Sequence, residues 1–263
     1  MTTTDRWADG DAYERFVGRW SRAVAPRFVD WLAVPPGSDW IDVGCGTGAL
    51  SATIVERAGP GSLLGVDPSA PFVEAARSRV HHPAARFALG SADAIPAPDD
   101  AAAAVVAGLV LNFVPDLGLA LAEARRVARS GATVAGDGWD YAGRMQPIRA
   151  VWDAAVALDP DAQALDEGRR FPIAAPGPLA DAFRAAGLRD VKTGEIEVPA
   201  RYRDFADYWS SFEADIGPAP GYATRLPAAR REALRERLRA SLPANPDGTI
   251  DLVARAWTVR GRA

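Results

Sequence analysis

The chain has 263 residues, of which 48% are hydrophobic and 24% charged, so it can bury a sizeable core and has ordinary globular composition. Its net charge of −4 and pI of about 5.3 argue against a nucleic-acid interface, which needs a concentrated basic face. A single cysteine excludes an internal disulfide and a cysteine-rich metal site. With no signal-like N-terminus and no apolar run of ~18 residues, we expect a soluble, cytoplasmic protein.

Short apolar runs alternate with helical segments from residue 38 to residue 137, the pattern of a parallel sheet covered by helices. A helical segment, Ala12 to Val34, precedes the first strand. Strands are predicted over residues 39–43, 62–66, 86–89, 103–109 and 132–136. Helices are predicted over residues 48–58, 69–80 and 117–129. This order predicts a doubly wound α/β fold.

The pattern changes after residue 137. Helices are predicted over residues 145–158 and 179–186, and alternation predicts strands over 191–198 and 250–259. Between these two strands lie helical segments at 202–216 and 227–242, bounded by the Pro/Gly runs 217–221 and 243–246. We expect this insertion, together with residues 12–20, to form a mobile cover over a site. The arginines of residues 225–239 alternate with Glu232 and Glu236, which indicates a solvated helix face rather than a binding patch.

A glycine-rich turn lies between the first predicted strand and helix, where Ile41 to Gly48 reads Ile-Asp-Val-Gly-Cys-Gly-Thr-Gly. Glycines let a ligand approach the backbone, and the helix N-terminus supplies unpaired N–H groups, so we expect a nucleotide-like ligand here. The spacing is not the Gly-x-Gly-x-x-Gly of dinucleotide-binding folds, and the carboxylate of Asp42 could meet a cationic amino group. The alternative is a turn with a structural role only.

Acidic residues also follow the next two strands. Asp67, 19 residues after Gly48, could accept hydrogen bonds from both hydroxyls of a ribose. Asp93, in the run Gly90 to Asp93, could accept one from the exocyclic amine of adenine. The alternatives are a helix cap at Asp67, a task that Ser69 could also perform, and a solvated turn at Asp93.

Together these three segments resemble the class I S-adenosylmethionine-dependent methyltransferases, in particular the small-molecule, type 11-like members. The resemblance is clear over about residues 13–140. It implies a Rossmann-like, doubly wound sheet of seven strands, mostly parallel with an antiparallel final strand, and a helical lid. It also implies S-adenosyl-L-methionine as cofactor and S-adenosyl-L-homocysteine as product. On this basis residues 1–36 form a helical cap and residues 37–263 the methyltransferase domain, with the insertion at about 202–245.

The resemblance also implies which residues contact the cofactor. They are Asp42, Gly44, Gly46 and Gly48 around the methionine moiety, Asp67, Pro68 and Ser69 at the ribose, Ala92 and Asp93 at the adenine, and Asn112 after the fourth strand. Tyr13 and Arg19 are candidates to reach the cofactor from the N-terminal segment, although the aromatic residues there also have the spacing of helix packing. The chain departs from the family at Ser130-Gly131-Ala132, where a Pro-Gly-Gly turn is usual, and at Ala101-Ala102, where Phe-Asp is usual.

The absent motifs narrow the chemistry. Enzymes that methylate base amino groups carry an Asn/Asp-Pro-Pro-aromatic loop where this chain has Asn112 to Pro115. The two histidines, His81 and His82, precede the third strand, at the end of the sheet opposite the expected cofactor. Methyl transfer should therefore depend on alignment, which can supply about 7 to 11 kcal/mol of the barrier. Three candidates for a base follow the fifth strand, and the alternative for them is a capping turn: Asp137, Asp140 and Tyr141.

Aromatic and flexible side chains near this end of the sheet indicate a small apolar or aromatic acceptor. They are Trp139, Tyr141, Met145 and Trp152, with Phe205, Tyr208, Trp209 and Phe212 on one helix face that we expect to be mostly packing. Two other functions stay open: a protein that binds S-adenosylmethionine without transferring methyl, and an NAD-dependent dehydrogenase, which the glycine spacing disfavours. The accepting atom and the oligomeric state are not predicted.

Overall fold

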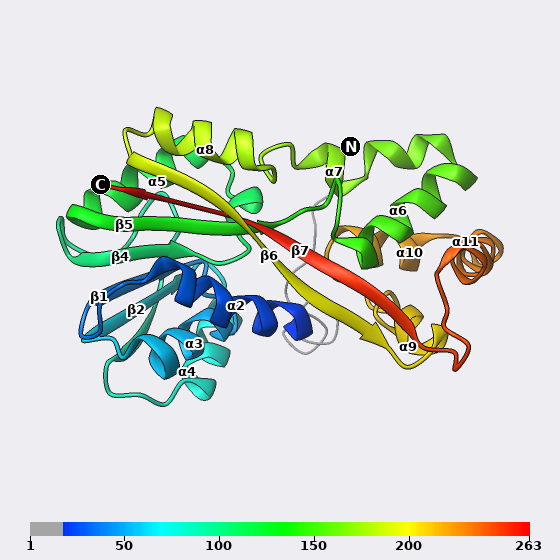
Figure 1. The fold of residues 1–263 in the computed structure, drawn as a ribbon, viewed down its shortest axis with the longest axis horizontal. Coiled ribbons are helices and arrows are strands. Elements are labelled where there is room, and N and C mark those ends of the chain that lie inside the picture. The colour runs from blue at the N-terminus through cyan, green and yellow to red at the C-terminus, as the bar shows by residue number, and fades with distance from the viewer. Residues whose placement is uncertain (1–17) are drawn as a thin grey trace. The chain divides into compact units, whose positions relative to one another are not determined.

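The computed structural model describes residues 18–263. Seven strands form one sheet in the order β3-β2-β1-β4-β5-β7-β6, with β7 antiparallel, which confirms the predicted fold class (Figure 1). The strands are β1 (Asp39–Val43), β2 (Ser62–Asp67), β3 (Ala85–Leu89), β4 (Ala102–Ala107), β5 (Ala128–Trp139), β6 (Arg189–Tyr202) and β7 (Ile250–Arg262). The helices are α2 (Arg19–Leu32), α3 (Ala49–Ala58), α4 (Ala70–Arg79), α5 (Leu117–Val127), α6 (Gln146–Leu158), α7 (Glu167–Arg170), α8 (Pro176–Ala185), α9 (Phe205–Ser210), α10 (Pro218–Arg225) and α11 (Ala228–Ser241), with short 3-10 turns η2 (Leu111–Phe113) and η3 (Pro160–Ala164).

The chain divides into two compact units. The first, here the sheet unit, comprises residues 21–138, 173–196 and 256–263. The second, here the helical unit, comprises residues 139–172 and 197–255 together with the described residues 18–20. Strands β6 and β7 contribute residues to both units.

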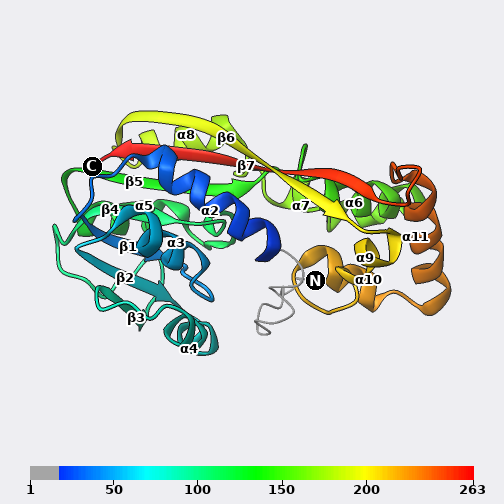
Figure 2. The same cartoon turned by 60° about the horizontal axis from the view of Figure 1, so that its bottom comes forward.

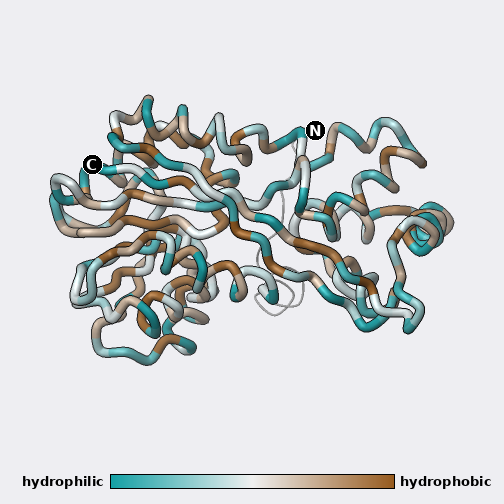
Figure 3. The backbone as a smooth tube through the Cα atoms, in the orientation of Figure 1, coloured by the Kyte–Doolittle hydropathy of each residue, from teal (hydrophilic) through white to brown (hydrophobic). Residues whose placement is uncertain are grey.

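Helices cover both faces of the strands in the sheet unit, because successive side chains of a strand point to opposite faces. Helices α2, α3 and α4 lie on one face, where Arg57 of α3 pairs with Asp30 of α2 at 2.7 Å (Figure 2). Helices α5 and α8 cover the other face, and their buried side chains pack against Ile41 and Val43 of β1. Hydrophobic stretches follow the central strands, as the brown segments of the tube show (Figure 3). This two-sided burial explains why these strands read as near-continuous apolar runs.

The parallel register brings the carboxyl ends of the strands to one edge of the sheet. Asp42 of β1 lies beside Gly65 of β2 and Val106 of β4. Ala107 of β4 lies beside Gly136 of β5. The turns that follow these strands therefore share one edge, which is where open α/β folds bind ligands.

Several predicted boundaries are wrong. Strand β6 runs to Tyr202, beyond the expected end at residue 198, and α9 ends at Ser210, short of the helix expected over residues 202–216. Helix α5 ends at Val127 and β5 begins at Ala128, so the expected turn at Ser130–Ala132 lies inside β5. The left-handed Gly131 (φ 78°) and a register shift between Ala102 and Ala104 accommodate this irregular start. The run 217–221, expected to separate helices, instead opens α10 at Pro218. Proline is tolerated in a first helical turn because its missing N–H has no partner there.

The charged face of helix α11 is solvated, as predicted, while Leu234 and Leu238 are buried. Arg235 pairs with Glu232 and Arg239 pairs with Glu236, each within one turn of the helix. Along the described chain, no helix combines the length and the apolar character that a membrane span requires.

Candidate active site

The glycine turn after β1 has the backbone conformation that its sequence predicts. Gly44, Gly46 and Gly48 have φ values of 70°, 53° and 88°, in the left-handed region that favours glycine. A Cβ on Gly44 would lie 2.7 Å from Cγ2 of Val110, so this glycine is required for close packing. A Cβ on Gly46 would meet no atom of residues 18–263 within 4 Å. The turn is therefore packed at Gly44 and open at Gly46.

Asp67, at the end of β2, braces this turn. Its Oδ2 accepts a hydrogen bond from the backbone N–H of Gly46 at 3.0 Å, and its Oδ1 accepts one from that of Ser69 at 2.8 Å. The side chain is buried, and burial raises its pKa while the two hydrogen bonds oppose the rise. The bond from Ser69 closes a local turn before α4, whose N-cap residue is Ser69 itself, so Asp67 does not cap this helix as the alternative reading expected. Contact with a ribose stays a prediction.

Asp42 is a buried carboxylate with an unsatisfied oxygen. Its Oδ2 accepts a hydrogen bond from Oγ of Ser51 at 2.6 Å. Its Oδ1 is buried and has no hydrogen-bond partner among residues 18–263. Burial raises the pKa of Asp42 to about 7; the bond from Ser51 opposes this rise and the charge of Asp67 adds to it. A carboxylate in this state is poised to take a cation or a hydrogen-bond donor.

The segment after β4 lies against the glycine turn. Leu109 has a left-handed backbone (φ 57°), and Val110 makes the contact with Gly44 described above. Asn112, in η2, has both side-chain amide atoms buried without a hydrogen-bond partner in the described structure. A ligand at this edge could satisfy them.

Asp137, near the end of β5, is the predicted base candidate that lies in the sheet unit. It is 2% exposed, and its Oδ1 accepts a hydrogen bond from the N–H of Leu109 at 2.7 Å. Burial raises the pKa of Asp137 to about 7, the bond from Leu109 lowers it, and the negative charge of Asp42 raises it further. Two carboxyl groups that disfavour each other's ionisation thus lie at this sheet edge.

The remaining cofactor candidates of the sheet unit lie in the turns after β2 and β3. Pro68 is exposed, and Ser69 opens α4 without a capping hydrogen bond from its side chain. Ala92 is half-buried, and the exposed Asp93 accepts a hydrogen bond from Oγ of Ser91. These residues follow the strand ends at which the sequence places them, and their contacts with an adenosine stay predictions.

The other two base candidates belong to the helical unit. Oδ2 of Asp140 accepts hydrogen bonds from Nη2 of Arg255 at 2.7 Å, from Nε of Arg255 at 3.0 Å and from the N–H of Arg144 at 2.6 Å. Tyr141 is 3% exposed and its ring lies 5.6 Å from that of Phe171. The ion pair of Asp140 has no counterpart in the sequence prediction, because Arg255 is 115 residues away.

The N-terminal candidates are described in part. Tyr13 lies outside the described residues, as do the first residues of the expected cover. The guanidinium group of Arg19 lies 4.7 Å from the ring centroid of Tyr202 and donates a hydrogen bond to the carbonyl oxygen of Arg201. A reach from Arg19 to the cofactor therefore stays a prediction.

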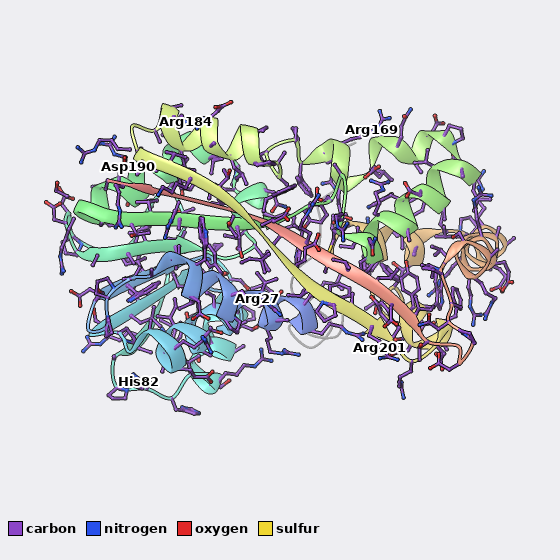
Figure 4. The ribbon with its side chains drawn as sticks, viewed as in Figure 1. Arg27, His82, Arg169, Arg184, Asp190 and Arg201 are labelled. Carbon is purple, nitrogen blue, oxygen red and sulfur yellow. The ribbon has the colours of Figure 1, made fainter. Side chains whose placement is uncertain are left out.

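The expected acceptor-lining side chains are buried within the helical unit. The buried residues are Trp139, Met145, Trp152, Phe205, Tyr208, Trp209 and Phe212, and burial agrees with a packing role. The prediction of one helix face for the last four is wrong in part, because α9 ends at Ser210 and Phe212 lies beyond it. The hydroxyl group of Tyr208 donates to the carbonyl oxygen of Pro147 at 2.8 Å. His81 and His82 are exposed before β3, as predicted, and His82 is labelled in Figure 4.

Comparison with known proteins agrees with this geometry. A family model described as "Methyltransferase domain" matches residues 41–135, which include the glycine turn, Asp67 and Asn112. A demethylmenaquinone methyltransferase of Roseiflexus sp. (strain RS-1) is 33% identical over 176 residues, which cover 61% of this chain and 72% of that protein. The nocamycin O-methyltransferase of Saccharothrix syringae is 32% identical over 192 residues, which cover 65% of this chain and 66% of that protein.

Solved structures share the fold. The YcgJ protein from Bacillus subtilis has a TM-score of 0.60 at 17% identity, covering 93% of this chain and 98% of that one. Phosphoethanolamine N-methyltransferase 2 of Haemonchus contortus, in complex with S-adenosyl-L-methionine, has a TM-score of 0.59 at 13% identity, covering 96% of this chain and 56% of that one. The chain belongs to the class I S-adenosylmethionine-dependent methyltransferases. It is a methyltransferase whose cofactor is S-adenosylmethionine.

The residues at the sheet edge fit this cofactor. The unpaired Oδ1 of Asp42 suits a cationic amino group, and the open face at Gly46 lets a ligand approach the backbone. The unsatisfied amide of Asn112 offers both a donor and an acceptor. A bound cofactor would give hydrogen-bond partners to the buried polar atoms of Asp42 and Asn112, which are otherwise costly to leave unpaired.

Proposed function

We propose that this methyltransferase methylates a small apolar or aromatic molecule, with the cofactor held at the carboxyl ends of β1, β2, β3 and β4. The observation that carries the cofactor placement is the buried, unpaired Oδ1 of Asp42 beside the open Gly46. Burying a charged oxygen without a partner is costly, so a site of this kind is expected to meet a cation when it works.

Each part of the cofactor has candidate partners in the sheet unit. Asp42 would hold the amino group of the methionine moiety, and Asp67 the ribose hydroxyls. Ala92 and Asp93 would contact the adenine, and Asn112 the methionine end. What supports this assignment is the order of the turns along one sheet edge, which follows from the parallel register of β1, β2 and β4.

When bound, S-adenosylmethionine supplies a methyl group on a positively charged sulfur. The task of the chain is to align the acceptor and to keep water away. Alignment alone can contribute about 7 to 11 kcal/mol, and no histidine of the described chain lies at this end of the sheet. The buried carboxylate of Asp42 also makes this edge favourable for positive charge.

The acceptor class rests on relatives and on composition. The names of related proteins mention demethylmenaquinone, nocamycin and 2-phytyl-1,4-naphtoquinone. The aromatic side chains after β5 and between β6 and β7 are mostly buried by packing, so the related proteins carry this inference. An aromatic or polyketide-like acceptor is therefore favoured over a nucleic acid, which the net charge of −4 also disfavours.

The test is a methyl-transfer assay with a panel of acceptors. Naphthoquinols, phenols and hydroxylated polyketides would be incubated with the full chain and S-adenosylmethionine, and both S-adenosylhomocysteine and methylated product would be measured by mass spectrometry. We expect product with at least one aromatic acceptor and none with RNA, DNA or peptide. Transfer to a nucleic acid or peptide alone would refute the proposed acceptor class.

A further inference from the structure

Leu109 has a backbone conformation that its side chain disfavours. Four non-glycine residues in the described part of the chain have positive φ, and Leu109 is the one beside the glycine turn, with φ 57°. A residue with a Cβ disfavours this conformation because the Cβ comes too close to the following carbonyl oxygen. It persists only where the surroundings enforce it, and such residues concentrate at functional sites.

Asp137 supplies the enforcing contact. Strands β4 and β5 are parallel neighbours, with Ala107 beside Gly136, so Asp137 reaches the turn that leaves β4. Its Oδ1 accepts the hydrogen bond from the N–H of Leu109 at 2.7 Å. Because Asp137 is 2% exposed, water does not compete with this bond.

The residues after Leu109 form one wall of the cofactor turn. Val110 fills the space beside Gly44, where a Cβ would lie 2.7 Å from Cγ2 and 2.9 Å from Cγ1. Asn112 follows in η2 with its unsatisfied amide. The direction in which the chain leaves Leu109 therefore determines where both side chains lie.

We propose that Asp137 is a positioning residue for cofactor binding: it holds Leu109 in the left-handed conformation and thereby seats Val110 against the glycine turn and fixes the amide of Asn112. This inference rests on the proposed cofactor site. In this role Asp137 acts through its acceptor oxygen rather than by taking a proton. An asparagine can accept the same hydrogen bond through its side-chain carbonyl, whereas an alanine cannot.

The test compares binding of S-adenosylhomocysteine by calorimetry in four variants. We expect Asp137→Asn to bind within about threefold of wild type and Asp137→Ala to bind at least about tenfold more weakly. Leu109→Gly alone should bind within about threefold of wild type, because glycine adopts positive φ without strain. Added to Asp137→Ala, it should recover at least about threefold of the lost affinity. Hydrogen exchange over residues 109–113 should be faster in Asp137→Ala and unchanged in Asp137→Asn.

Several outcomes would overturn the positioning role. If asparagine and alanine weakened binding equally, the charge of Asp137 rather than its hydrogen bond to Leu109 would determine cofactor affinity. Unchanged affinity in Asp137→Ala, or no recovery on adding Leu109→Gly, would show that the hydrogen bond between Asp137 and Leu109 has no effect on cofactor affinity. If the alanine variant does not fold, Asp137→Val fills more of the space without an acceptor and takes its place under the same expectations. Wild-type protein that fails to bind S-adenosylhomocysteine would instead refute the proposed site itself.

Discussion

Asp67 joins two turns of the sheet edge through its two oxygens, so its removal tests the cofactor site directly. We expect Asp67→Ala to weaken S-adenosylhomocysteine binding by roughly tenfold or more, since hydrogen bonds to a charged group contribute about 1.5 to 3 kcal/mol. Calorimetry measures the loss. Asp181→Ala, in an exposed ion pair on α8, is the matched control and should bind as wild type does. Unchanged affinity in Asp67→Ala would remove this residue from the site.

Variants of Asp140 and Tyr141 distinguish a structural role from a catalytic one. The ion pair between Asp140 and Arg255 leaves the two side chains 6% and 18% exposed, and removing one partner of such a pair costs about 3 to 5 kcal/mol. We expect Asp140→Ala to lower the free energy of unfolding in urea by about this amount.

Once an acceptor is known, Asp140→Asn and Tyr141→Phe should keep turnover within about a hundredfold of wild type. A loss above a thousandfold in a folded variant would identify a general base.

At the scale of single residues, the sequence predicts positions better than partners. Asp42 and Asp67 can be located because they belong to short motifs next to strand ends. Ser51 as the partner of Asp42, and Arg255 as the partner of Asp140, depend on helix rotation and on distant strand pairing. The left-handed Leu109 has no signal at all, since leucine at this conformation contradicts its own preference.

The glycine turn as an element yields a graded prediction. Alanine at Gly44 must displace the side chain of Val110. Alanine at Gly46 meets open space among the described residues, so its only cost is the strain of a residue with a Cβ at a φ of 53°. We expect Gly46→Ala to lose about 1 to 2 kcal/mol of stability and Gly44→Ala more than that. Both should weaken S-adenosylhomocysteine binding. Thermal unfolding measures the two losses of stability, and calorimetry measures the two losses of affinity. Intact affinity in Gly46→Ala would show that the open side of Gly46 does not face the cofactor.

The elements themselves follow from the sequence where a periodic apolar pattern meets a clear boundary. Strands β1 and β2 and helices α3 and α4 begin and end within a residue or so of expectation. The start of β5 differs from the prediction because a serine-glycine pair usually breaks a strand, and here an irregular register accommodates it. Helix α10 is not predicted because two prolines in its first turn are typical of a loop. In both cases local composition had two compatible structures, and tertiary contacts chose one.

The stability of the whole chain should depend on pH through Asp42 and Asp137. Burial raises the pKa of both to about 7, well above the value of 3.8 expected for an exposed aspartate. The folded chain then binds more protons than the unfolded chain, so the free energy of unfolding falls as pH rises from about 4 to about 7. Carboxylates with a lowered pKa, such as Glu123, have the opposite effect: they stabilise the folded chain, and this contribution is lost only at lower pH, when they become protonated.

Urea unfolding at pH 5 and pH 8 measures this dependence. We expect the wild-type chain to be more stable at pH 5, and Asp42→Asn and Asp137→Asn each to reduce the difference. Asp181→Asn, at an exposed position, should leave it unchanged. A wild-type chain that gains stability between pH 5 and pH 8 would mean that these carboxylates are ionised without penalty.

Cys45, the one cysteine of the chain, lies buried between two glycines of the cofactor turn. Burial raises the pKa of its thiol, so the reactive thiolate is scarce while the turn is closed. We therefore expect a maleimide to modify Cys45 slowly, at a rate set by opening of the turn. The chain thus carries a natural chemical reporter at its cofactor turn, and its rate of alkylation measures that opening without an introduced label.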